Sequence, residues 1–359
     1  MSSLLQSIGV ALPIIQAPMA GTSTPQMAAA VTNAGALGSI GVGGTDAAGA
    51  RAMIAAMREA TQGPLNVNVF CHEPAKVDLA RHAAWIAALK PVFSRFGAAP
   101  PAELHEIYTS FVADEAMLRL FLETRPAVVS FHFGLPPADK IAALKAAGIL
   151  LLASATSLAE AEQAVAVGVD GVVAQGYEAG GHRGMFDPAA PDDRLGVFAL
   201  TRLLVSRIAL PVVAAGGIMD GAGIAAVLDL GAEAAQLGTA FVGCPESNAD
   251  AYHRQALFGP GAAHTEMTAL ISGRPARCLP NSITGLKEIL GGLAPPDYPI
   301  AYDAGKALNA AAKAKSDGGF GAQWAGQGAP LARALPAAEL VATLKDELAA
   351  ARASRVTKL

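Results

Sequence analysis

The residues with the clearest chemical potential lie in one stretch of the chain, 170–184, which reads DGVVAQGYEAGGHRG. Its first half is a short apolar run, and such runs are typical of strands buried on both faces of a parallel sheet. The run ends at Gln175, and the loop after it contains Glu178, four glycines and His182. Polar residues that appear only where a buried strand ends indicate a site at the carboxyl end of a sheet. Neutral imidazole is a suitable base near pH 7, so His182 is a candidate for proton transfer.

Other predicted strands end in residues of the same kind. Amides, glycines and a hydroxyl suit a neutral ring with several hydrogen-bonding edges, and they lack the carboxylate cluster of a metal site. We therefore expect a bound ring and no metal. A histidine near a strand end is also often a hydrogen-bonded structural residue, so the residues alone leave the roles of both histidines open. The further strand-end residues are Asn68, His132, Gly216, Gly217, Gln236, Gly238 and Thr239.

Two glycine-containing stretches, AAGGIMDGAG and QLGT, stand at the ends of the seventh and eighth predicted strands. Glycines there let backbone amides and a helix amino terminus face one anion, as in the phosphate site of many barrels. Glycine after a strand is also ordinary turn punctuation. Neither a GxGxxG motif nor a GxxxxGK[ST] motif is present, so we expect a ligand with one phosphate rather than a dinucleotide.

These side chains need a scaffold that brings many strand ends together. Apolar runs recur along the chain, each followed by a helical pattern, which predicts parallel strands with helical crossovers. Eight such units favour a closed (β/α)8 TIM barrel of the α/β class over an open doubly wound sheet. The expected strands span residues 13–19, 36–42, 65–70, 127–134, 148–154, 171–175, 211–217 and 232–241.

Two regions interrupt the repeat. About 55 residues separate the third and fourth strands, which is too long for a crossover loop, and we expect an inserted helical element at roughly 103–123. The strand-helix rhythm also stops after Cys244. We therefore predict a barrel over 1–244, a smaller lid or side domain over 245–305, and a segment 306–359 that packs back on the barrel. The segment 336–351 has the pattern of an amphipathic helix with Leu340, Val341, Leu344 and Leu348 on one face.

Tyr298, Tyr302 and Lys306 are spaced four residues apart around Pro299. The proline prevents one helix from holding all three, but a helix that starts after it places Tyr302 and Lys306 on one face. A solvated helix face is the alternative. Further on, Phe320 and Trp324 stand in a glycine-rich loop, where they either pack as a plug or cover a planar ligand.

Composition narrows the class of protein. The 359 residues are 52% apolar and 16% charged, with a net charge of −4 and no basic tract, so we expect no nucleic-acid partner. The amino terminus lacks the positive region of a signal peptide, and no apolar run is long enough for a membrane span, so we expect no membrane association. Three widely spaced cysteines fit neither a disulfide framework nor a zinc site, which favours a cytoplasmic location.

Taken together, these stretches resemble the class I nitronate monooxygenases, formerly called 2-nitropropane dioxygenases. The resemblance runs through nearly the whole chain in the expected order. Its motifs are QAPMAG at Gln16, NVNVF with Asn68, SFHFG with His132, QGYEAGGHRG with Gln175 and His182, AAGGI with Gly217, QLGT at Gln236, and the Tyr298/Tyr302/Lys306 segment.

The resemblance implies an FMN-dependent (β/α)8 barrel that oxidises alkyl nitronates with dioxygen, through a flavosemiquinone, to an aldehyde or oxo acid plus nitrite. It implies His182 as the base, with His132 as a second catalytic residue. Lys306 and a protonated histidine would supply positive charge to an anionic substrate. The implied FMN contacts are Asn68, Gln175, Gly180, Gly217, Gln236, Leu237, Gly238 and Thr239, and the implied substrate contacts are Tyr108, Tyr298, Tyr302 and Lys306.

Three alternatives remain. The first is a flavin reductase on the same barrel that uses NAD(P)H to reduce a quinone or an enoyl thioester. The second is a flavin-free isomerase or aldolase, which would need a lysine or paired carboxylates that the strand ends do not supply. The third is a non-catalytic binder of small molecules. The sequence is compatible with a monomer or a homodimer.

Overall fold

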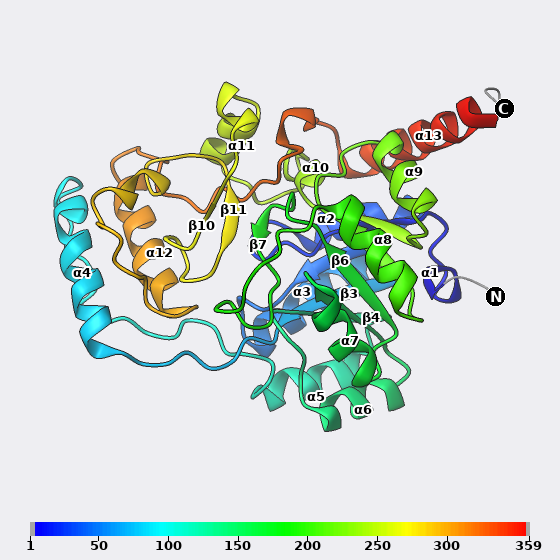
Figure 1. Cartoon of the computed structure of the whole chain (residues 1–359), viewed down its shortest axis with the longest axis horizontal. Helices are drawn as coiled ribbons and strands as arrows, with labels where there is room; N and C mark the ends of the chain where they lie inside the picture. Colours follow the sequence, from blue (N-terminus) through cyan, green and yellow to red (C-terminus); the bar gives the residue numbers. More distant parts are fainter. Residues whose placement is uncertain (1–3, 357–359) are drawn as a thin grey trace.

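The structure is a computed structural model that describes residues 4–356, so the predicted domain limits at residues 1 and 359 lie outside the described residues. Two lobes are visible in Figure 1. The barrel fills one side, with helices α8 (Val197–Arg207) and α9 (Gly221–Asp229) on its outside. A second lobe, which contains α4 (Leu79–Ser94) and α12 (Ile300–Lys313) and which we call the side lobe, lies at the other end of the molecule.

Eight parallel strands form one sheet in the order β1-β9-β8-β6-β5-β4-β3-β2. A single bridge between Ile15 and Leu37 joins the two edge strands and closes the sheet into a barrel. The predicted (β/α)8 TIM barrel is therefore confirmed, and the doubly wound sheet is wrong. The strands are β1 Ile14–Gln16, β2 Gly38–Gly41, β3 Leu65–Phe70, β4 Val128–His132, β5 Leu150–Ala155, β6 Gly171–Gln175, β8 Val212–Ala215 and β9 Ala234–Leu237.

A ring of helices surrounds the strands, and polar caps start most of them. Thr24 accepts a hydrogen bond from the amide of Met27 at the start of α2, and Asp220 caps α9 in the same way. The ring consists of α2 Pro25–Asn33, α3 Ala47–Ala60, α5 Glu115–Thr124, α6 Ala138–Ala146, α7 Leu158–Ala166, α8 Val197–Arg207, α9 Gly221–Asp229 and α13 Ala337–Val356.

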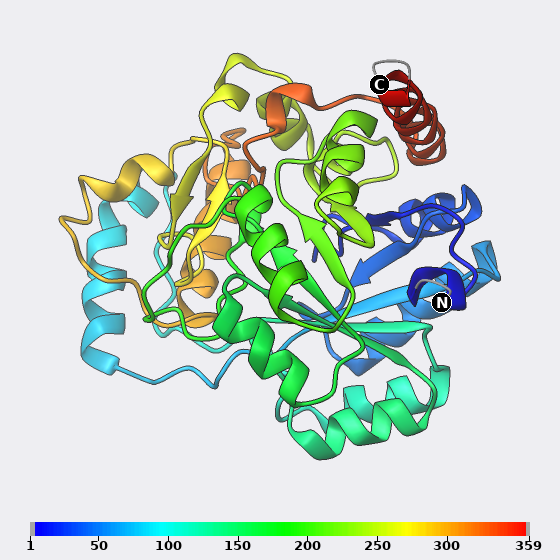
Figure 2. The same ribbon diagram turned by 45° about the vertical axis from the view of Figure 1, so that its right-hand side comes forward.

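The last helix, α13, completes the ring although the side lobe separates it from the barrel in sequence. It packs between α9 and α2, which places it where the eighth helix of a barrel belongs (Figure 2). The four predicted apolar residues are buried on one face of this helix, in a cluster with residues of α9 and α2. The predicted amphipathic helix is confirmed.

Apolar side chains fill the barrel below its carboxyl-end mouth. Ile15, Leu37, Val128, Leu152 and Val213 come from five different strand regions and belong to one buried cluster. Leu5 of the short helix α1 (Leu4–Ser7) joins the same cluster. Below the mouth, this end of the barrel is thus a packed core that supports the strand ends.

Some predicted boundaries are wrong, each for a local reason. The seventh strand stops at Ala215 because Gly216 and Gly217 take φ angles of +123° and +68°. The eighth stops at Leu237, and Thr239–Val242 forms the short helix α10 instead. Periodicity alone does not separate strand from helix in so short an apolar run.

The predicted insertion is also only partly right. Residues 115–123 are helical in α5, but 103–114 are not, because this segment is tied to both lobes. The amide of His105 bonds to Asp303 in the side lobe, and the amide of Phe111 bonds to the carbonyl of Phe70 at the end of β3. Tertiary contacts outweigh helix propensity here. Helix α4, Leu79–Ser94, which Asp78 caps, is not among the predicted elements.

The side lobe has a hydrophobic cluster of its own. Trp85 and Phe93 of α4 and Leu308 of α12 (Ile300–Lys313) are buried in it together with Phe320. A small antiparallel sheet of order β10-β11-β7 lies between this cluster and the barrel mouth, and its strands are β10 Glu266–Thr268, β11 Ala276–Cys278 and β7 Gly181–His182. The remaining elements are α11 Ala251–Leu257 and the 3-10 turns Pro260–Ala263, Thr284–Lys287 and Ala329–Leu331. The division at residues 244 and 305 stays a prediction.

Two further findings concern the described residues alone. Between residues 4 and 356, no helix is long and apolar enough to cross a membrane. In the same range, no group of three or more His, Cys, Asp or Glu side chains is placed to hold a metal ion.

The close approach of β2 to α2 predicts a large effect of one methyl group. A Cβ atom at Gly38 would lie 1.9 Å from the carbonyl oxygen of Ala28, so one backbone must move. We expect Gly38→Ala to lower the free energy of unfolding by about 2 to 3 kcal/mol, as overpacking does. Gly261→Ala is the matched control because a Cβ there meets nothing within 4 Å. Equal urea midpoints for the two variants would contradict this packing.

Candidate active site

A cavity of about 550 Å³ opens at the carboxyl ends of the barrel strands, and the side lobe forms part of its wall. Its volume is in the range of small-molecule and cofactor sites. Leu237 is the exception among the predicted residues, because its side chain is buried in the outer core and its carbonyl bonds to the amide of Ala17. The predicted residues that line the cavity are Asn68, Tyr108, His132, Gln175, Gly180, His182, Gly217, Gln236, Gly238, Thr239, Tyr298, Tyr302 and Lys306.

Gln175, at the end of β6, fixes the loop that carries His182. Its Nε2 donates to the carbonyl of His182 at 3.0 Å, and its Oε1 accepts from the amide of Gly184 at 2.7 Å. β7 then pairs with β11, which aligns His182 with Ala276 of the side lobe. The loop is therefore held from the barrel by one side chain and from the side lobe by a strand.

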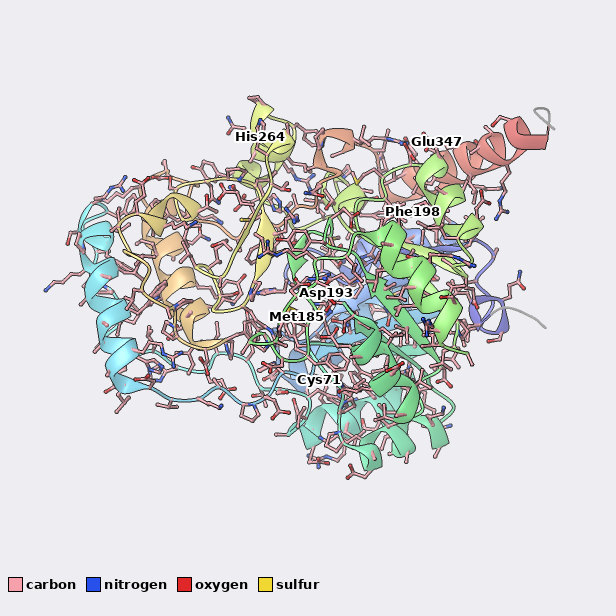
Figure 3. All side chains as sticks on the ribbon, viewed as in Figure 1. Cys71, Met185, Asp193, Phe198, His264 and Glu347 are labelled. Carbon is pink, nitrogen blue, oxygen red and sulfur yellow. The ribbon has the colours of Figure 1, made fainter. Side chains whose placement is uncertain are left out.

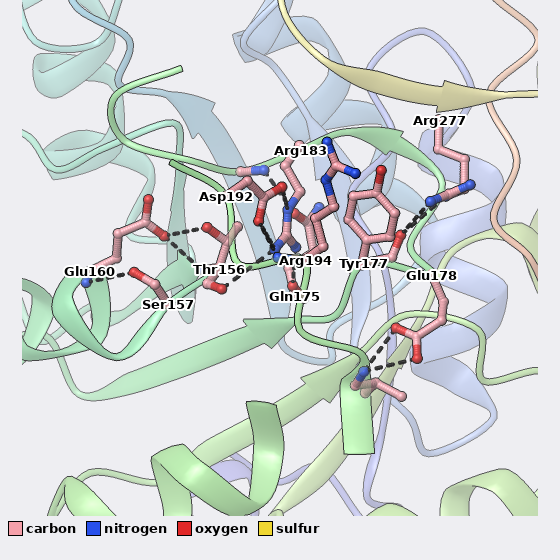
Figure 4. A network of polar contacts seen from close by, with 12 residues as sticks. Thr156, Ser157, Glu160, Gln175, Tyr177, Glu178, Arg183, Asp192, Arg194 and Arg277 are labelled. Atoms are coloured by element: carbon pink, nitrogen blue, oxygen red, sulfur yellow. Dashed lines mark hydrogen bonds and ion pairs between the residues drawn. The ribbon is translucent and has the colours of Figure 1, made fainter. Parts of the chain in front are cut away.

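An ion-pair network on the outer side of this loop adds rigidity (Figure 4). The Arg183 guanidinium is buried, pairs with Asp192 at 3.0 Å and also donates to the carbonyl of Gln175. Glu178 points away toward the barrel wall, where its carboxylate accepts from the amide of Val197 at 2.8 Å and caps α8. Glu178 is thus a structural residue of this loop. The Asp192 carboxylate likewise stabilises the loop, through its ion pair with Arg183.

Both ring nitrogens of His132 have hydrogen-bond partners. Nε2 lies 3.3 Å from the carbonyl oxygen of His182, and Nδ1 lies 3.0 Å from the hydroxyl of Ser154. A carbonyl only accepts, so Nε2 carries the proton in neutral His132 and Nδ1 accepts from Ser154. His132 therefore lines the cavity and is also fully hydrogen-bonded. It has both the position expected of a functional residue and the bonding expected of a structural one.

His182 uses only one ring nitrogen among the described residues. Its Nε2 lies 2.8 Å from the hydroxyl of Ser272, and Nδ1 takes part in none of the hydrogen bonds found within residues 4–356. Aromatic rings surround the imidazole, with centroids of Trp324 and Tyr298 at 5.1 and 5.3 Å. Trp324 lines the cavity, whereas Phe320 packs against Phe96 inside the side lobe.

Burial keeps both histidines neutral. Desolvation, helped by the neighbouring imidazole and the Arg274 guanidinium, lowers the pKa of His182 to about 3. Desolvation lowers the pKa of His132 to about 4, although its bond to the His182 carbonyl opposes the shift. The expected protonated histidine is therefore wrong for the resting site at neutral pH, because no carboxylate of the described residues there offsets the charge of an imidazolium, as the anion formed from a substrate would.

The positive charge of the site comes from Lys306 and Arg274. Helix α12 begins after Pro299, as expected, and the Lys306 ammonium lies 4.6 Å from the ring centroid of Tyr108 and 5.4 Å from that of Tyr302. Arg274 is 3% exposed, and its guanidinium lies 4.4 Å from the ring centroid of Phe133, directly behind both histidines. These charges favour an anionic ligand.

Tyr298 has a buried hydroxyl with no hydrogen-bond partner among the described residues. Burial raises its pKa well above the ordinary value, and burial raises the pKa of Tyr108 to about 12. Both phenols therefore keep their protons at neutral pH and are hydrogen-bond donors. An unpaired donor in the wall of a cavity is expected where a ligand completes the hydrogen bonding.

Glycines and a helix start form the opposite end of the cavity. Gly216 and Gly217 turn the chain after β8, and α9 begins four residues later at Gly221. Thr239 accepts a hydrogen bond at 2.9 Å from the amide of Gly326 in the side lobe. The predicted phosphate site would lie at these glycines and at Thr239, which line the cavity. The amides of Gly221 and Gly223 at the start of α9 are already bonded to Glu347 and Asp220, and the phosphate site stays a prediction.

Several residues of the site escaped the sequence analysis. Ser154 is the last residue of the fifth predicted strand, 148–154, and lies one residue before the end of β5, so the same strand-end rule finds it. Ser272 and Arg274 lie between β10 and β11, in a region without any strand-helix repeat. Phe133 has a φ angle of +74°, which no pattern in the sequence indicates.

Comparison with known proteins agrees with this geometry. The model of the family described as nitronate monooxygenase matches residues 2–347. A nitronate monooxygenase of Paraburkholderia phytofirmans is 64% identical over 346 residues, which cover 96% of this chain and 94% of that protein. The chain belongs to the nitronate monooxygenase family. Members of this family are flavin-dependent oxidoreductases, and this chain is an oxidoreductase of that kind.

Further similarities extend to structure. A nitronate monooxygenase of Pseudomonas aeruginosa is 57% identical over 95% of this chain and 97% of that protein. The nitroalkane oxidase of Streptomyces ansochromogenes superposes with a TM-score of 0.90 at 40% identity, over 98% of this chain and 99% of that one. FabK of Thermotoga maritima superposes with a TM-score of 0.76 at 26% identity, over 99% and 98%. The barrel and the side lobe are thus both part of the nitronate monooxygenase architecture.

The buried histidines predict a loss of stability in acid. His72 is buried beside Arg274, and its Nε2 lies 3.9 Å from a carboxylate oxygen of Glu106. Neither ring nitrogen has a hydrogen-bond partner among the described residues, and desolvation lowers the pKa of His72 to about 4. Between pH 6.5 and 4 the unfolded chain binds a proton that the folded chain does not, so stability falls as pH falls. For His72 alone the loss is about 3 kcal/mol.

We expect His72→Leu to flatten the dependence of the urea midpoint on pH between 7 and 4. His264→Leu is the control, because His264 is exposed at the surface (Figure 3). An equally steep dependence in wild type and His72→Leu would show that His72 is not a buried neutral residue.

Proposed function

We propose that this protein is an FMN-dependent nitronate monooxygenase. It oxidises alkyl nitronates such as propionate 3-nitronate with dioxygen and gives an aldehyde or oxo acid plus nitrite. The observation that carries the proposal is that residues from at least six strand ends and from α12 line one cavity, in a chain of this family. A neutral histidine and a lysine stand in the wall of that cavity.

The cavity fits FMN. Its glycine-rich end, with Gly216, Gly217 and Gly238, suits the phosphate because backbone can approach an anion closely there. Gly180 lines the same cavity and has no room for a side chain, since a Cβ would lie 2.4 Å from the amide nitrogen of Gly326. Both amide hydrogens of Asn68 are used by Ser130, which leaves Oδ1 to accept from a ring N–H. Gly217, Gln236, Gly238 and Thr239 complete the set that would hold the cofactor, with Gln175 beneath the loop. When bound, FMN supplies the one-electron redox chemistry between nitronate and dioxygen.

The substrate lies between the histidines and the tyrosines of the side lobe. Lys306 and Arg274 attract the anion, and the protonated hydroxyls of Tyr108, Tyr298 and Tyr302 donate hydrogen bonds to its oxygens. Apolar ring faces around His182 exclude water, which strengthens these interactions. A neutral nitroalkane needs one additional step, in which His182 removes the α-proton.

The alternative is an FMN-dependent reductase that uses NAD(P)H to reduce a quinone or an enoyl thioester. The likeness to an enoyl reductase domain from Bacillus amyloliquefaciens, with a TM-score of 0.63 at 10% identity, shows a shared fold alone. The Tyr298/Tyr302/Lys306 set favours a small anion. A cytoplasmic location and a monomeric or homodimeric state stay predictions.

Oxygen consumption decides between the two functions. We expect yellow protein with about one FMN per chain, rapid oxygen uptake with propionate 3-nitronate, and release of nitrite. NADH oxidation with a quinone is expected to be slow. Rapid anaerobic bleaching of the flavin by NADH without nitronate oxidation would favour the reductase, and colourless protein that takes up no FMN would contradict both.

His182→Asn separates proton removal from oxidation. We expect this variant to retain FMN and to lose about 100-fold or more in kcat/KM for a neutral nitroalkane, the contribution of a general base. The loss with the pre-formed nitronate is expected to be far smaller, because that substrate has already lost its proton. His264→Asn is the exposed control. Equal losses with both substrates would remove His182 from the proton-transfer step.

A further inference from the structure

Among the residues that the structure describes, Ser272 is the only side-lobe residue that forms a hydrogen bond with the ring of His182. It lies in the segment between β10 and β11 and is 0% exposed. Its hydroxyl has three neighbours: Nε2 of His182 at 2.8 Å, the carbonyl of Arg274 at 3.3 Å and the amide of Arg274 at 3.4 Å.

Hydrogen-bond accounting gives this cluster one favoured arrangement. A serine hydroxyl has one hydrogen and two lone pairs, the Arg274 amide only donates and the Arg274 carbonyl only accepts. If the hydroxyl donates to the carbonyl, it can accept from the amide and from a protonated Nε2, and all three neighbours are satisfied. If it donates to Nε2 instead, the carbonyl loses its bond to the buried hydroxyl, and a buried polar group left unpaired costs about 1 to 3 kcal/mol.

The second histidine cannot take over the base's role. Nδ1 of His132 accepts from Ser154, and Nε2 of His132 donates to the His182 carbonyl. The Nδ1 atom of His182 is left as the ring nitrogen without a hydrogen-bond partner in the described cavity wall.

We propose that Ser272 is a positioning residue that fixes His182 in the Nε2-protonated tautomer and so makes Nδ1 the nitrogen that accepts the substrate's α-proton. This inference rests on the proposed function. In the step, the Cα–H bond of a neutral nitroalkane breaks, its electron pair forms the C=N bond of the nitronate, and the proton passes to Nδ1. The nitro group takes the negative charge, and the N–H that already points at Ser272 stays in place.

The tautomer can be measured without any turnover. In holoenzyme labelled with 15N-histidine, the protonated and unprotonated ring nitrogens of His182 give distinct chemical shifts, and His182→Asn assigns them among the seven histidines. We expect wild type at pH 7 to show a proton on Nε2 and none on Nδ1. In Ser272→Ala we expect a mixture of the two tautomers. A proton on Nδ1 in wild type would overturn the proposal.

Kinetics give the second readout. The quantity is the ratio of kcat/KM for a neutral nitroalkane to kcat/KM for its pre-formed nitronate. We expect Ser272→Ala to lower this ratio by about 10- to 100-fold, since loss of an orienting partner leaves part of the base in the wrong tautomer. Ser272→Thr keeps the hydroxyl and is expected to restore the ratio. An unchanged ratio in a folded, flavin-containing Ser272→Ala enzyme would overturn the proposal.

Ser247→Ala is the matched control. Ser247 is also a buried serine whose hydroxyl donates to a carbonyl, that of Val242, and accepts from the amide two residues on, at Ala249. It does not line the cavity. A fall of the ratio in this variant as large as in Ser272→Ala would assign the effect to general loss of stability and contradict the proposal. An enzyme that oxidises neither substrate contradicts the proposed function instead, and the tautomer measurement still decides the assignment of Ser272.

Discussion

The pairing of β7 with β11 is the constraint on which the site depends. β7 follows the barrel strand β6 in the chain, yet its two residues, Gly181 and His182, belong to the sheet of the side lobe. The imidazole is therefore placed by two hydrophobic cores at once. Gln175 fixes the loop to the barrel, and the strand pairing fixes it to Ala276 and Arg277. A side chain with two rigid supports can be held to the tolerance that proton transfer requires.

The same enclosure sets the electrostatics. Apolar rings and a buried guanidinium make protonation of His132 and His182 unfavourable, so the cavity holds neutral imidazoles beside fixed positive charge from Arg274 and Lys306. A neutral base next to fixed cations is suited to removing a proton from a substrate that becomes an anion. This arrangement lowers the stability of the folded protein in acid, because the histidines can bind protons freely in the unfolded chain.

The sequence predicts the barrel well because its signals are local. The buried parallel strand Val212–Ala215 is a continuous apolar run, and caps such as Thr24 and Asp220 start helices with their own side chains. Strand ends share one rim by topology, so Asn68, His132 and Gln175 could be grouped without coordinates. Tyr302 and Lys306 follow from helical spacing after a proline.

The remainder depends on contacts that no local pattern encodes. Residues 103–114 have helical composition but are not helical, because the amide of His105 bonds to Asp303 and the amide of Phe111 bonds to Phe70. Ser272 and Arg274 reach the site only because the side lobe folds against the barrel mouth. The histidines are neutral because their side chains are buried. That a residue stands at a strand end does not show how deeply its side chain is buried. Leu237 stands in a motif of the family, yet its alternation on β9 turns the side chain outward into the helix layer.

The position of α13 bears on how the protein forms during synthesis. This helix occupies the gap between α9 and α2, although the ribosome makes it after the entire side lobe. Until it emerges, the apolar flanks of both neighbouring helices remain uncovered, in a nascent chain whose strands are already present. Such an intermediate is prone to association with other unfolded chains and is a natural client for chaperones that shield apolar surface. The apolar flanks of α9 and α2 are thus covered by α13 only after the whole side lobe has been synthesised.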